Sequence, residues 1–342
     1  MKNILDLGPG GGTGGLEELV SELGEKKFRA GQIFGWLAKG VTSFDEMSNL
    51  PAALRAKLRE EWYIGQPSVV SEQRSADGTV KCLFEFADGA RVESVFMKYS
   101  YGNSICISSQ VGCRMGCSFC ASTIEGKERD LTAGEMLGEV LAMRNHTGES
   151  INHVVIMGMG EPFDNYEEVS GFLRLINSPK GVNLSLRNIT VSTCGIIPVI
   201  GRFAEDFPQV NLAVSLHAPN DEIRRRTMPV AKAYAYDELM RACREYTEKT
   251  HRRISFEYAL INGVNDSRIN AEELSGRLKG WLTHVNLIPL NEVDGRDYRT
   301  ATGESVRAFK KVLEDNGIAV TVRRTLGSDI DAACGQLRQR KR

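Results

Sequence analysis

The sequence has no excess of charge of either sign. Its 342 residues include 43 Lys and Arg and 44 Asp and Glu, which leaves a formal net charge of -1 at pH 7. This balance gives no global attraction to a polyanion, so a contact with RNA would depend on local basic patches. The chain also lacks a run of about 18 apolar residues that could span a membrane. Its start, MKNILDLGPG, has no basic region followed by an apolar stretch, so we expect no secretory signal and no membrane contact.

These absences predict a cytoplasmic protein of ordinary globular composition, with 42% hydrophobic and 25% charged residues. The length predicts one large domain with one or two small ones. Apolar residues at helical spacing predict helices over residues 15–36 and 51–62, and alternating runs predict a small β unit over residues 68–98. We divide the chain into three units, residues 1–65, 66–100 and 101–342.

From about residue 105, apolar β-branched runs alternate with helical segments. The runs cover residues 104–109, 153–157, 188–193, 211–216, 253–260, 284–289 and 318–323. The helical segments between them include residues 132–143, 166–176, 236–246 and 304–316. This alternation predicts a parallel sheet, either open or rolled into a barrel. Barrels of this type carry their chemistry at the C-terminal ends of the strands, where Glu161, Ser192 and His217 follow the runs.

Three of the eight cysteines, Cys113, Cys117 and Cys120, form a C-x3-C-x2-C pattern, and Cys106 precedes them by seven residues. In the reducing cytosol such cysteines are more often metal ligands or catalysts than structural disulfides. Structural zinc takes four protein ligands, and no second C-x2-C or H-x3-H pair follows. A cubane iron–sulfur cluster normally takes four cysteines, so three leave one iron open to a substrate or cofactor. The pattern favours an iron–sulfur cluster, with zinc and incidental thiols as alternatives.

Six separated motifs extend this pattern along the chain. They read CISSQVGCRMGCSFCAST, VVIMGMGEPFDN, ITVSTCGIIP, AVSLHAPNDEIRRRTMP, HVNLIPLN and GSDIDAACGQL. Together they resemble the radical S-adenosylmethionine (SAM) ribosomal RNA adenine methyltransferases, over residues 24 to 338. The resemblance implies an α/β fold, a partial (βα)6 barrel of the TIM type with a small N-terminal helical accessory domain and a short β linker unit. It also implies one four-iron four-sulfur cluster on Cys113, Cys117 and Cys120, with SAM on the open iron and two SAM molecules used per turnover.

The resemblance assigns the residues that bind SAM. They are Gly160, Glu161, Ser192, Ser215, Leu216, His217 and Asn291. Taken alone, the Gly-Glu pair would be a strand-to-helix turn, Ser192 a helix cap and His217 a structural histidine. Asn286 is the nearby competitor of Asn291, which we prefer because it follows the strand.

Three further residues acquire catalytic roles only through the resemblance. Cys334 corresponds to a cysteine that one SAM methylates, a step that needs a thiolate. A second SAM yields a radical that removes hydrogen from this methyl group, and the resulting carbon radical adds to adenine and links protein and RNA. Cys106 corresponds to the cysteine that helps to remove the ring proton and then forms a disulfide with Cys334. Glu93 corresponds to a proton acceptor, although taken alone it would be a solvated strand residue.

The implied reaction is methylation of C2 of an adenosine in large-subunit (23S) ribosomal RNA and in the anticodon loop of some transfer RNAs. The C2 carbon cannot attack a SAM methyl group as an amine would, which explains the need for a radical. An external electron donor such as flavodoxin or ferredoxin is implied. The alternative product is 8-methyladenosine, made by related enzymes that confer antibiotic resistance; Pro162 in GMGEP favours the C2 group. A non-catalytic iron–sulfur or zinc RNA-binding module is an alternative of another class.

Two basic stretches offer local charge for phosphate groups. They are Arg224, Arg225 and Arg226, and the tail at residues 338–342. A solvated face is the simplest interpretation of each.

The N-terminal region contains two notable stretches. Arg29, Gln32 and Trp36 are typical of the accessory domain, which is expected to contact RNA. The glycine-rich stretch LDLGPGGGTGG at residues 5–15 looks like a SAM-binding turn of another fold, but the required strand and acidic residue are missing. We predict a flexible connection there.

Overall fold

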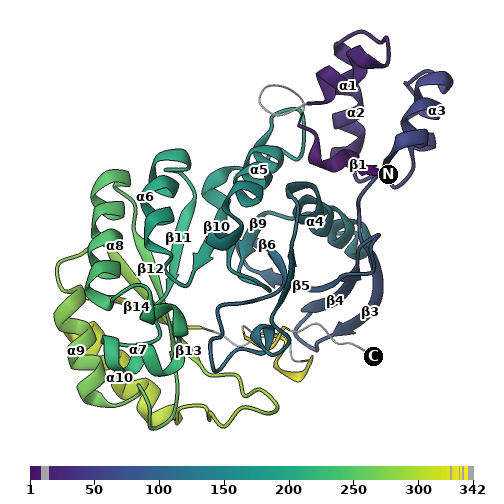
Figure 1. The fold of residues 1–342 in the computed structure, drawn as a ribbon. Coiled ribbons are helices and arrows are strands. Elements are labelled where there is room, and N and C mark those ends of the chain that lie inside the picture. The colour runs from purple at the N-terminus through teal and green to yellow at the C-terminus, as the bar shows by residue number, and fades with distance from the viewer. Residues whose placement is uncertain (9–14, 324–325, 331, 333–334, 338–342) are drawn as a thin grey trace.

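The computed structural model describes residues 1–8, 15–323, 326–330, 332 and 335–337. Within these residues, ten strands form one curved, open sheet in the order β14-β13-β12-β11-β10-β9-β6-β5-β4-β3 (Figure 1). The strands are β3 (Ser68–Arg74), β4 (Val80–Glu85), β5 (Arg91–Tyr99), β6 (Gly102–Ile107), β9 (His153–Ile156), β10 (Ile189–Thr193), β11 (Asn211–Ser215), β12 (Ile254–Leu260), β13 (Thr283–Pro289) and β14 (Ala319–Val322).

Seven strands of this sheet, β6, β9, β10, β11, β12, β13 and β14, run parallel to one another. Each connection between them contains at least one helix. The helices are α4 (Ala133–Thr147), α5 (Tyr166–Asn177), α6 (Ile197–Asp206), α7 (Asp221–Thr227), α8 (Tyr236–Thr250), α9 (Arg268–Leu278) and α10 (Gly303–Asp315). Six strand–helix units followed by β14 confirm the predicted partial (βα)6 barrel, and every predicted strand run coincides with a strand.

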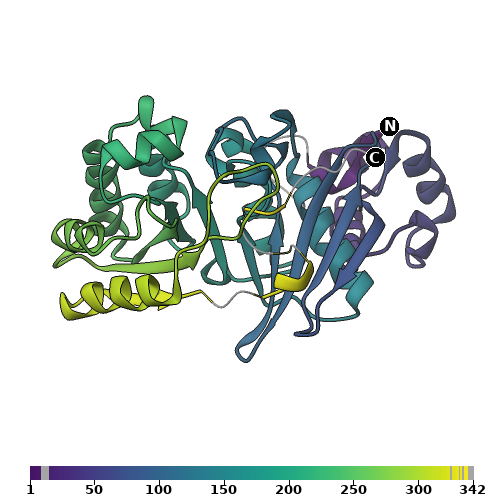
Figure 2. The same cartoon turned by 90° about the horizontal axis from the view of Figure 1, so that it is seen from below.

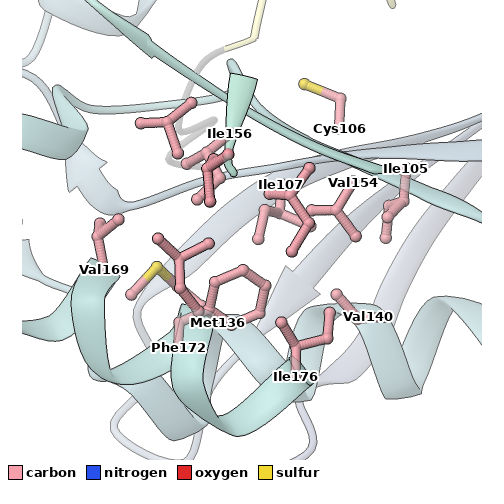
Figure 3. Packing of buried hydrophobic residues seen from close by; sticks show 14 of the residues in the cluster. Ile105, Cys106, Ile107, Met136, Val140, Val154, Ile156, Val169, Phe172 and Ile176 are labelled. Carbon is pink, nitrogen blue, oxygen red and sulfur yellow. The ribbon is translucent and has the colours of Figure 1, made fainter. Parts of the chain in front are cut away.

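The first strand of the barrel shows how the sheet divides its two faces. Ile105 and Ile107 of β6 point toward α4 and α5, where they meet residues such as Val140 and Ile176 (Figure 3). Cys106 lies between them in sequence and points to the opposite, concave face (Figure 3). Side chains of a strand alternate between faces, so the apolar pair fixes the direction of the cysteine.

The predicted β unit is present as β3, β4 and β5, which pair antiparallel with one another. They continue the barrel sheet, because β5 pairs antiparallel with β6 and places Val95 opposite Cys106. The concave face of the barrel therefore extends onto these strands. The boundaries of the three units stay a prediction.

The N-terminal region contains α1 (Leu16–Glu22), α2 (Phe28–Lys39) and α3 (Ala52–Glu61), with a short pair of strands, β1 (Lys2–Asn3) and β2 (Trp62–Tyr63). The helical pattern over residues 15–36 is divided at Gly24, whose φ of +79° is a conformation that ends helices. The second predicted helix corresponds to α3. Among the described residues no helix is both long and apolar enough to cross a membrane.

The prediction of a flexible connection at residues 5–15 is wrong for its first part. Leu5 is buried, and the carboxylate of Asp6 accepts a hydrogen bond of 2.8 Å from the backbone N–H of Gly134 at the start of α4. This placement follows from the unpaired N–H groups that a helix presents at its N-terminus. Residues 9–14 lie outside the described residues.

Candidate active site

A cavity of about 1030 Å³, part of it open to solvent, lies at the C-terminal ends of the parallel strands. Its walls come from the cysteine loop and from the ends of several strands, as expected for a barrel of this type. Nine of the predicted site residues line it, namely Cys113, Cys117, Cys120, Gly160, Glu161, Ser192, Ser215, His217 and Asn291. Leu216, Cys106 and Glu93 are not part of this lining.

The loop that carries the three cysteines is fixed at its start and in its middle by backbone hydrogen bonds. The N–H of Cys113 donates to the carbonyl of Gly126 over 3.0 Å, and the N–H of Ser118 donates to the carbonyl of Thr227 over 2.9 Å. A Cβ atom at Gly112 would lie 1.9 Å from the Gly126 oxygen, so only glycine fits there. The C-terminal end of α7 therefore holds the middle of the loop against the cavity.

The thiols of this loop lie in surroundings that disfavour the ionised form. Burial raises the pKa of Cys113 to about 12, and burial together with the neighbouring thiolates raises the pKa of Cys117 well above its usual range. Thiolates here need a bound cation, which deprotonates cysteine when it coordinates. No group of three or more His, Cys, Asp or Glu side chains within the described ranges could hold a single metal ion. The three cysteines instead border a cavity with room for a polynuclear cluster.

Glu161 is the most completely hydrogen-bonded carboxylate of the cavity wall. It accepts hydrogen bonds from the Thr193 hydroxyl (2.6 Å), the Cys194 N–H (2.7 Å) and the Phe163 N–H (3.0 Å). Burial raises its pKa, while these donors favour the ionised form. The Cys194 thiol forms a further side-chain hydrogen bond with this carboxylate, so donors surround it on the protein side.

Gln110 supports this carboxylate from the preceding motif. Its Oε1 accepts a hydrogen bond from the N–H of Glu161 over 2.9 Å, and its Nε2 donates to Asp164 over 2.9 Å. Asp164 also pairs with Arg114 and, at 3.1 Å, with Lys127. Sequence reasoning missed Gln110 and Asp164, although both stand inside the quoted motifs SSQVGC and GEPFDN.

His217 is held as a neutral ring. Its Nδ1 accepts a hydrogen bond of 2.9 Å from the N–H of Ala259, so the proton of the neutral ring is on Nε2. Burial, and secondarily the charge of Arg224, lowers the pKa of His217 to about 3. The backbone φ of +53° turns the residue, and the ring of Phe119 packs edge-on against it at 5.0 Å. His217 can therefore donate one hydrogen bond from Nε2 over a wide pH range.

The other predicted SAM contacts differ in how they reach the cavity. Leu216 is fully buried, and its N–H donates to the carbonyl of Glu257, so its side chain belongs to the core. Asn291 lines the cavity, whereas Asn286 is engaged by Glu257, to which its Nδ2 donates over 2.9 Å. Glu257, which sequence reasoning also missed, is a buried carboxylate that pairs with Arg323 at 4.0 Å.

Cys334 lies outside the described residues, but the residues around it are well anchored. The carbonyl of Gly335 accepts a hydrogen bond from the N–H of Ala121 over 2.7 Å, directly after the cysteine loop. The N–H of Gly327 donates to Asp77 in the turn between β3 and β4 over 3.0 Å. The short yellow helix at residues 328–330 lies beside the blue strands (Figure 2), and Gly335 and Leu337 line the cavity.

Glu93 lies near Cys106 on the concave face. In the register of β5 and β6, Val95 stands opposite Cys106, and Glu93 is two residues away on the same face. Glu93 is buried, with its carboxylate 3.4 Å from the ammonium group of Lys81. The simplest interpretation of Glu93, a solvated strand residue, is therefore wrong.

The basic stretches also differ from their simplest interpretation. Arg224 is fully buried, whereas Arg225 and Arg226 are exposed. Arg224 lies on the buried side of α7 together with Ile223 and Thr227, so it cannot contact a phosphate group on the surface. Residues 338–342 lie outside the described residues.

Comparisons with known proteins agree with this site. Residues 107–273 match the model of the radical SAM superfamily, and residues 3–64 match the model of the ribosomal RNA large subunit methyltransferase N-terminal domain. A protein of Clostridium tetani described as "Probable dual-specificity RNA methyltransferase RlmN" is 50% identical over 99% of this chain and 97% of its own. A protein of Lachnospira eligens with the same description is 54% identical over 95% of this chain and 94% of its own.

A solved structure has the same fold throughout. The crystal structure of a radical SAM methyltransferase from Sphaerobacter thermophilus superposes with a TM-score of 0.94 at 44% identity, covering 99% of both chains. About half of the residues are identical to those of these relatives over nearly the whole chain, two family models match, and the fold is shared. The chain therefore belongs to the radical-SAM RNA methyltransferase family.

Proposed function

We propose that this enzyme methylates C2 of an adenosine in large-subunit ribosomal RNA and of an adenosine in the anticodon loop of some transfer RNAs. The observation that carries the proposal is the convergence in one cavity of the three-cysteine loop, Glu161 and the residues beside Cys334. The relatives are named dual-specificity RNA methyltransferases, which supports the two classes of RNA.

The radical SAM superfamily implies SAM and an iron–sulfur cluster, and the cavity suits both. We assign Cys113, Cys117 and Cys120 as the ligands of one four-iron four-sulfur cluster, because three thiols with no fourth cysteine in the loop leave one iron open. When bound, the cluster and SAM supply the one-electron chemistry that activates a methyl C–H bond, and two SAM molecules are used per turnover.

The residues of the wall fit the polar groups of SAM. Glu161 would offer its carboxylate to the amino group, and His217 its Nε2–H as a donor. Ser192, Ser215 and Asn291 line the same cavity and would position the remaining polar groups of the nucleoside and methionine. Gly160 and Leu216 would contribute backbone.

We propose that Cys334 accepts the methyl group that is later transferred, since its neighbour Gly335 lines the cavity. Cys106 on the concave face would help to remove the proton from the adenine ring and then form a disulfide with Cys334. Glu93 is the proposed proton acceptor; it lies on the same face as Cys106, one strand away. Exclusion of water from this face protects a reactive carbon centre from side reactions.

The remaining assignments follow from the substrate. A one-electron donor such as flavodoxin or ferredoxin would reduce the enzyme, and a cytoplasmic location would bring it to ribosomal RNA. The division into residues 1–65, 66–100 and 101–342 assigns RNA contact to the first unit. Within that unit Nη1 of Arg29 donates to Oε1 of Gln32 over 2.7 Å, so the two residues lie side by side on α2.

Anaerobic reconstitution with iron and sulfide, followed by a reductant, SAM and a ribosomal RNA fragment, tests the proposal. Mass spectrometry should find 2-methyladenosine, and 5′-deoxyadenosine should accumulate. Cys120→Ala should abolish both products, whereas Cys243→Ala, a buried cysteine of α8 outside the cavity lining, should retain them. Formation of 8-methyladenosine would contradict the C2 assignment, and normal turnover by Cys120→Ala would contradict the cluster assignment.

A further inference from the structure

Arg224 is a fully buried guanidinium with too few partners. Its Nη2 donates to the carbonyl of Cys194 over 2.5 Å and to the carbonyl of Ser215 over 3.5 Å. Its Nε and Nη1 are buried and have no hydrogen-bond partner among the described residues. No carboxylate within the described part of the chain forms an ion pair with it. Polar hydrogens in such a position cost free energy unless an acceptor reaches them.

An isolated buried cation also requires an anion. Removing a guanidinium from water costs several kcal/mol, roughly, and this cost is offset only by an opposite charge nearby. Burial lowers the pKa of Arg224, but an arginine stays protonated in proteins, so the charge remains. The structure must therefore supply a negative charge close to this side chain when the site is complete.

The cavity that the three cysteines border lies next to this side chain. Both of its hydrogen-bond acceptors, the carbonyls of Cys194 and Ser215, belong to residues that line that cavity. The helix of Arg224 also contacts the cysteine loop directly. The carbonyl of Thr227, three residues further along α7, accepts a hydrogen bond from the N–H of Ser118, which follows Cys117. One short helix thus carries the buried charge and holds the loop of the cluster ligands.

Arg224 also connects the cysteine loop with the SAM side of the cavity. The carbonyl of Cys194 accepts from Arg224, and the N–H of Cys194 donates to Glu161 over 2.7 Å. The guanidinium is therefore held in place by the same turn that orients the proposed amine acceptor. The cation is already held in position. It can therefore stabilise an added negative charge at the cysteines without any rearrangement of the protein.

We propose that Arg224 is the buried counter-charge of the cysteine-bound iron–sulfur cluster and makes its one-electron reduction easier. Three thiolates outweigh the charge of the oxidised cubane core, so the site is anionic, and reduction adds one more negative charge. A fixed cation stabilises the reduced form more than the oxidised form. The inference rests on the proposed cluster, and it makes Arg224 a positioning and electrostatic residue rather than a ligand.

The test is a redox titration of the reconstituted, full-length enzyme with dithionite, without SAM or RNA, followed by electron paramagnetic resonance. Arg224→Met keeps a similar volume and removes the charge. We expect a midpoint potential lower by about 59 mV or more, which is a tenfold change in a one-electron equilibrium. Arg224→Lys should recover most of the wild-type potential. Arg226→Met, an equal change of charge at an exposed position of α7, should leave the potential unchanged.

The outcomes separate the possibilities. A fully loaded Arg224→Met cluster with the wild-type potential would overturn the inference. If Arg224→Met fails to load iron, the inference requires Arg224→Lys to load and Arg224→Gln to fail; failure of the lysine variant as well would assign the residue to shape alone and overturn the charge role. If the wild-type protein itself binds no iron and sulfide, the cluster assignment falls first, and this inference falls with it.

Discussion

The carboxylate of Asp77 accepts a hydrogen bond from the backbone N–H of Gly327, with Oδ2 and N 3.0 Å apart. Although burial opposes it, hydrogen bonds from Thr79 and from the Gly327 amide hold the pKa of Asp77 well below its usual range. This contact anchors one end of the segment that carries Cys334, and the bond between Ala121 and Gly335 anchors the other end. The β3–β4 turn, far from the cysteines in sequence, therefore helps to position the proposed methyl carrier.

Asp77→Ala should uncouple RNA methylation from SAM cleavage. A hydrogen bond to a charged group contributes about 1.5–3 kcal/mol, so we expect methylation to fall about tenfold or more, with 5′-deoxyadenosine still formed. The control is Asp88→Ala in the next turn, because Asp88 accepts the N–H of Ala90 and pairs with Arg129 at 2.7 Å, and neither partner belongs to the C-terminal segment. Quantifying both products by mass spectrometry checks this, and equal losses in the two variants would show that Asp77 has no special role.

Gly160→Ala should abolish tight SAM binding. The added Cβ would lie 2.6 Å from Cβ of Gln110, in a backbone with φ of +99°, so the Gln110 and Glu161 contacts would shift. We expect at least tenfold weaker SAM binding to the reconstituted enzyme by equilibrium dialysis. Gly263→Ala introduces similar backbone strain, at φ of +68°, in open space, and should lower only stability. Wild-type affinity in Gly160→Ala would contradict the role given to this turn.

His217 should make the protein less stable in mild acid. Its folded pKa of about 3 lies below the ordinary value of about 6.5, so the unfolded chain binds a proton that the folded chain refuses. The contribution of the neutral His217 to stability is therefore fully present above the pKa of the unfolded chain, about 6.5, and falls as the pH drops from there toward 3. Between pH 7 and pH 5.5 the wild-type protein should lose about 1 kcal/mol of unfolding free energy more than His217→Gln. Urea unfolding at both pH values measures the difference, and parallel losses would contradict it.

Asp164→Asn should weaken the hold on the iron–sulfur cluster. The carboxylate binds Gln110, Arg114 and Lys127 around the cysteine loop, and partners behind metal ligands typically affect metal affinity by about 10–100-fold. Release of iron to a chelator should be at least tenfold faster than in the wild-type enzyme. Asp315→Asn breaks a pair with Lys311 on the surface of α10 and serves as the control. Unchanged release from Asp164→Asn would show that the loop does not depend on this carboxylate.

The strands and the cavity lining were predictable because local patterns determine them. Apolar β-branched runs fix the strands, and parallel strands bring their C-terminal ends together, so polar residues such as Ser192 and Ser215 meet without any knowledge of distance. Arg224 could not be predicted, because the run DEIRRRT does not tell which arginine faces the core. That choice depends on which side of α7 faces the core, and Ile223 and Thr227 are buried on the same side as Arg224.

The long-range supports of the site were equally hidden. Asp77 and Gly327 are 250 residues apart, and neither residue stands in a motif that indicates the other. The link of Cys106 with Cys334 came only from the family resemblance, since the first is a buried strand residue and the second is outside the described residues.

The central claim is that the transferred carbon passes through Cys334 and that Cys106 releases the product. The most direct measurement is peptide mass spectrometry of Cys106→Ala after anaerobic reaction with SAM carrying a labelled methyl group and with an RNA fragment. We predict a covalent protein–RNA adduct in which Cys334 is joined to an adenosine through the labelled carbon, while the wild-type enzyme releases 2-methyladenosine. Normal turnover by Cys106→Ala without an adduct, or an adduct on any other residue, would contradict the account.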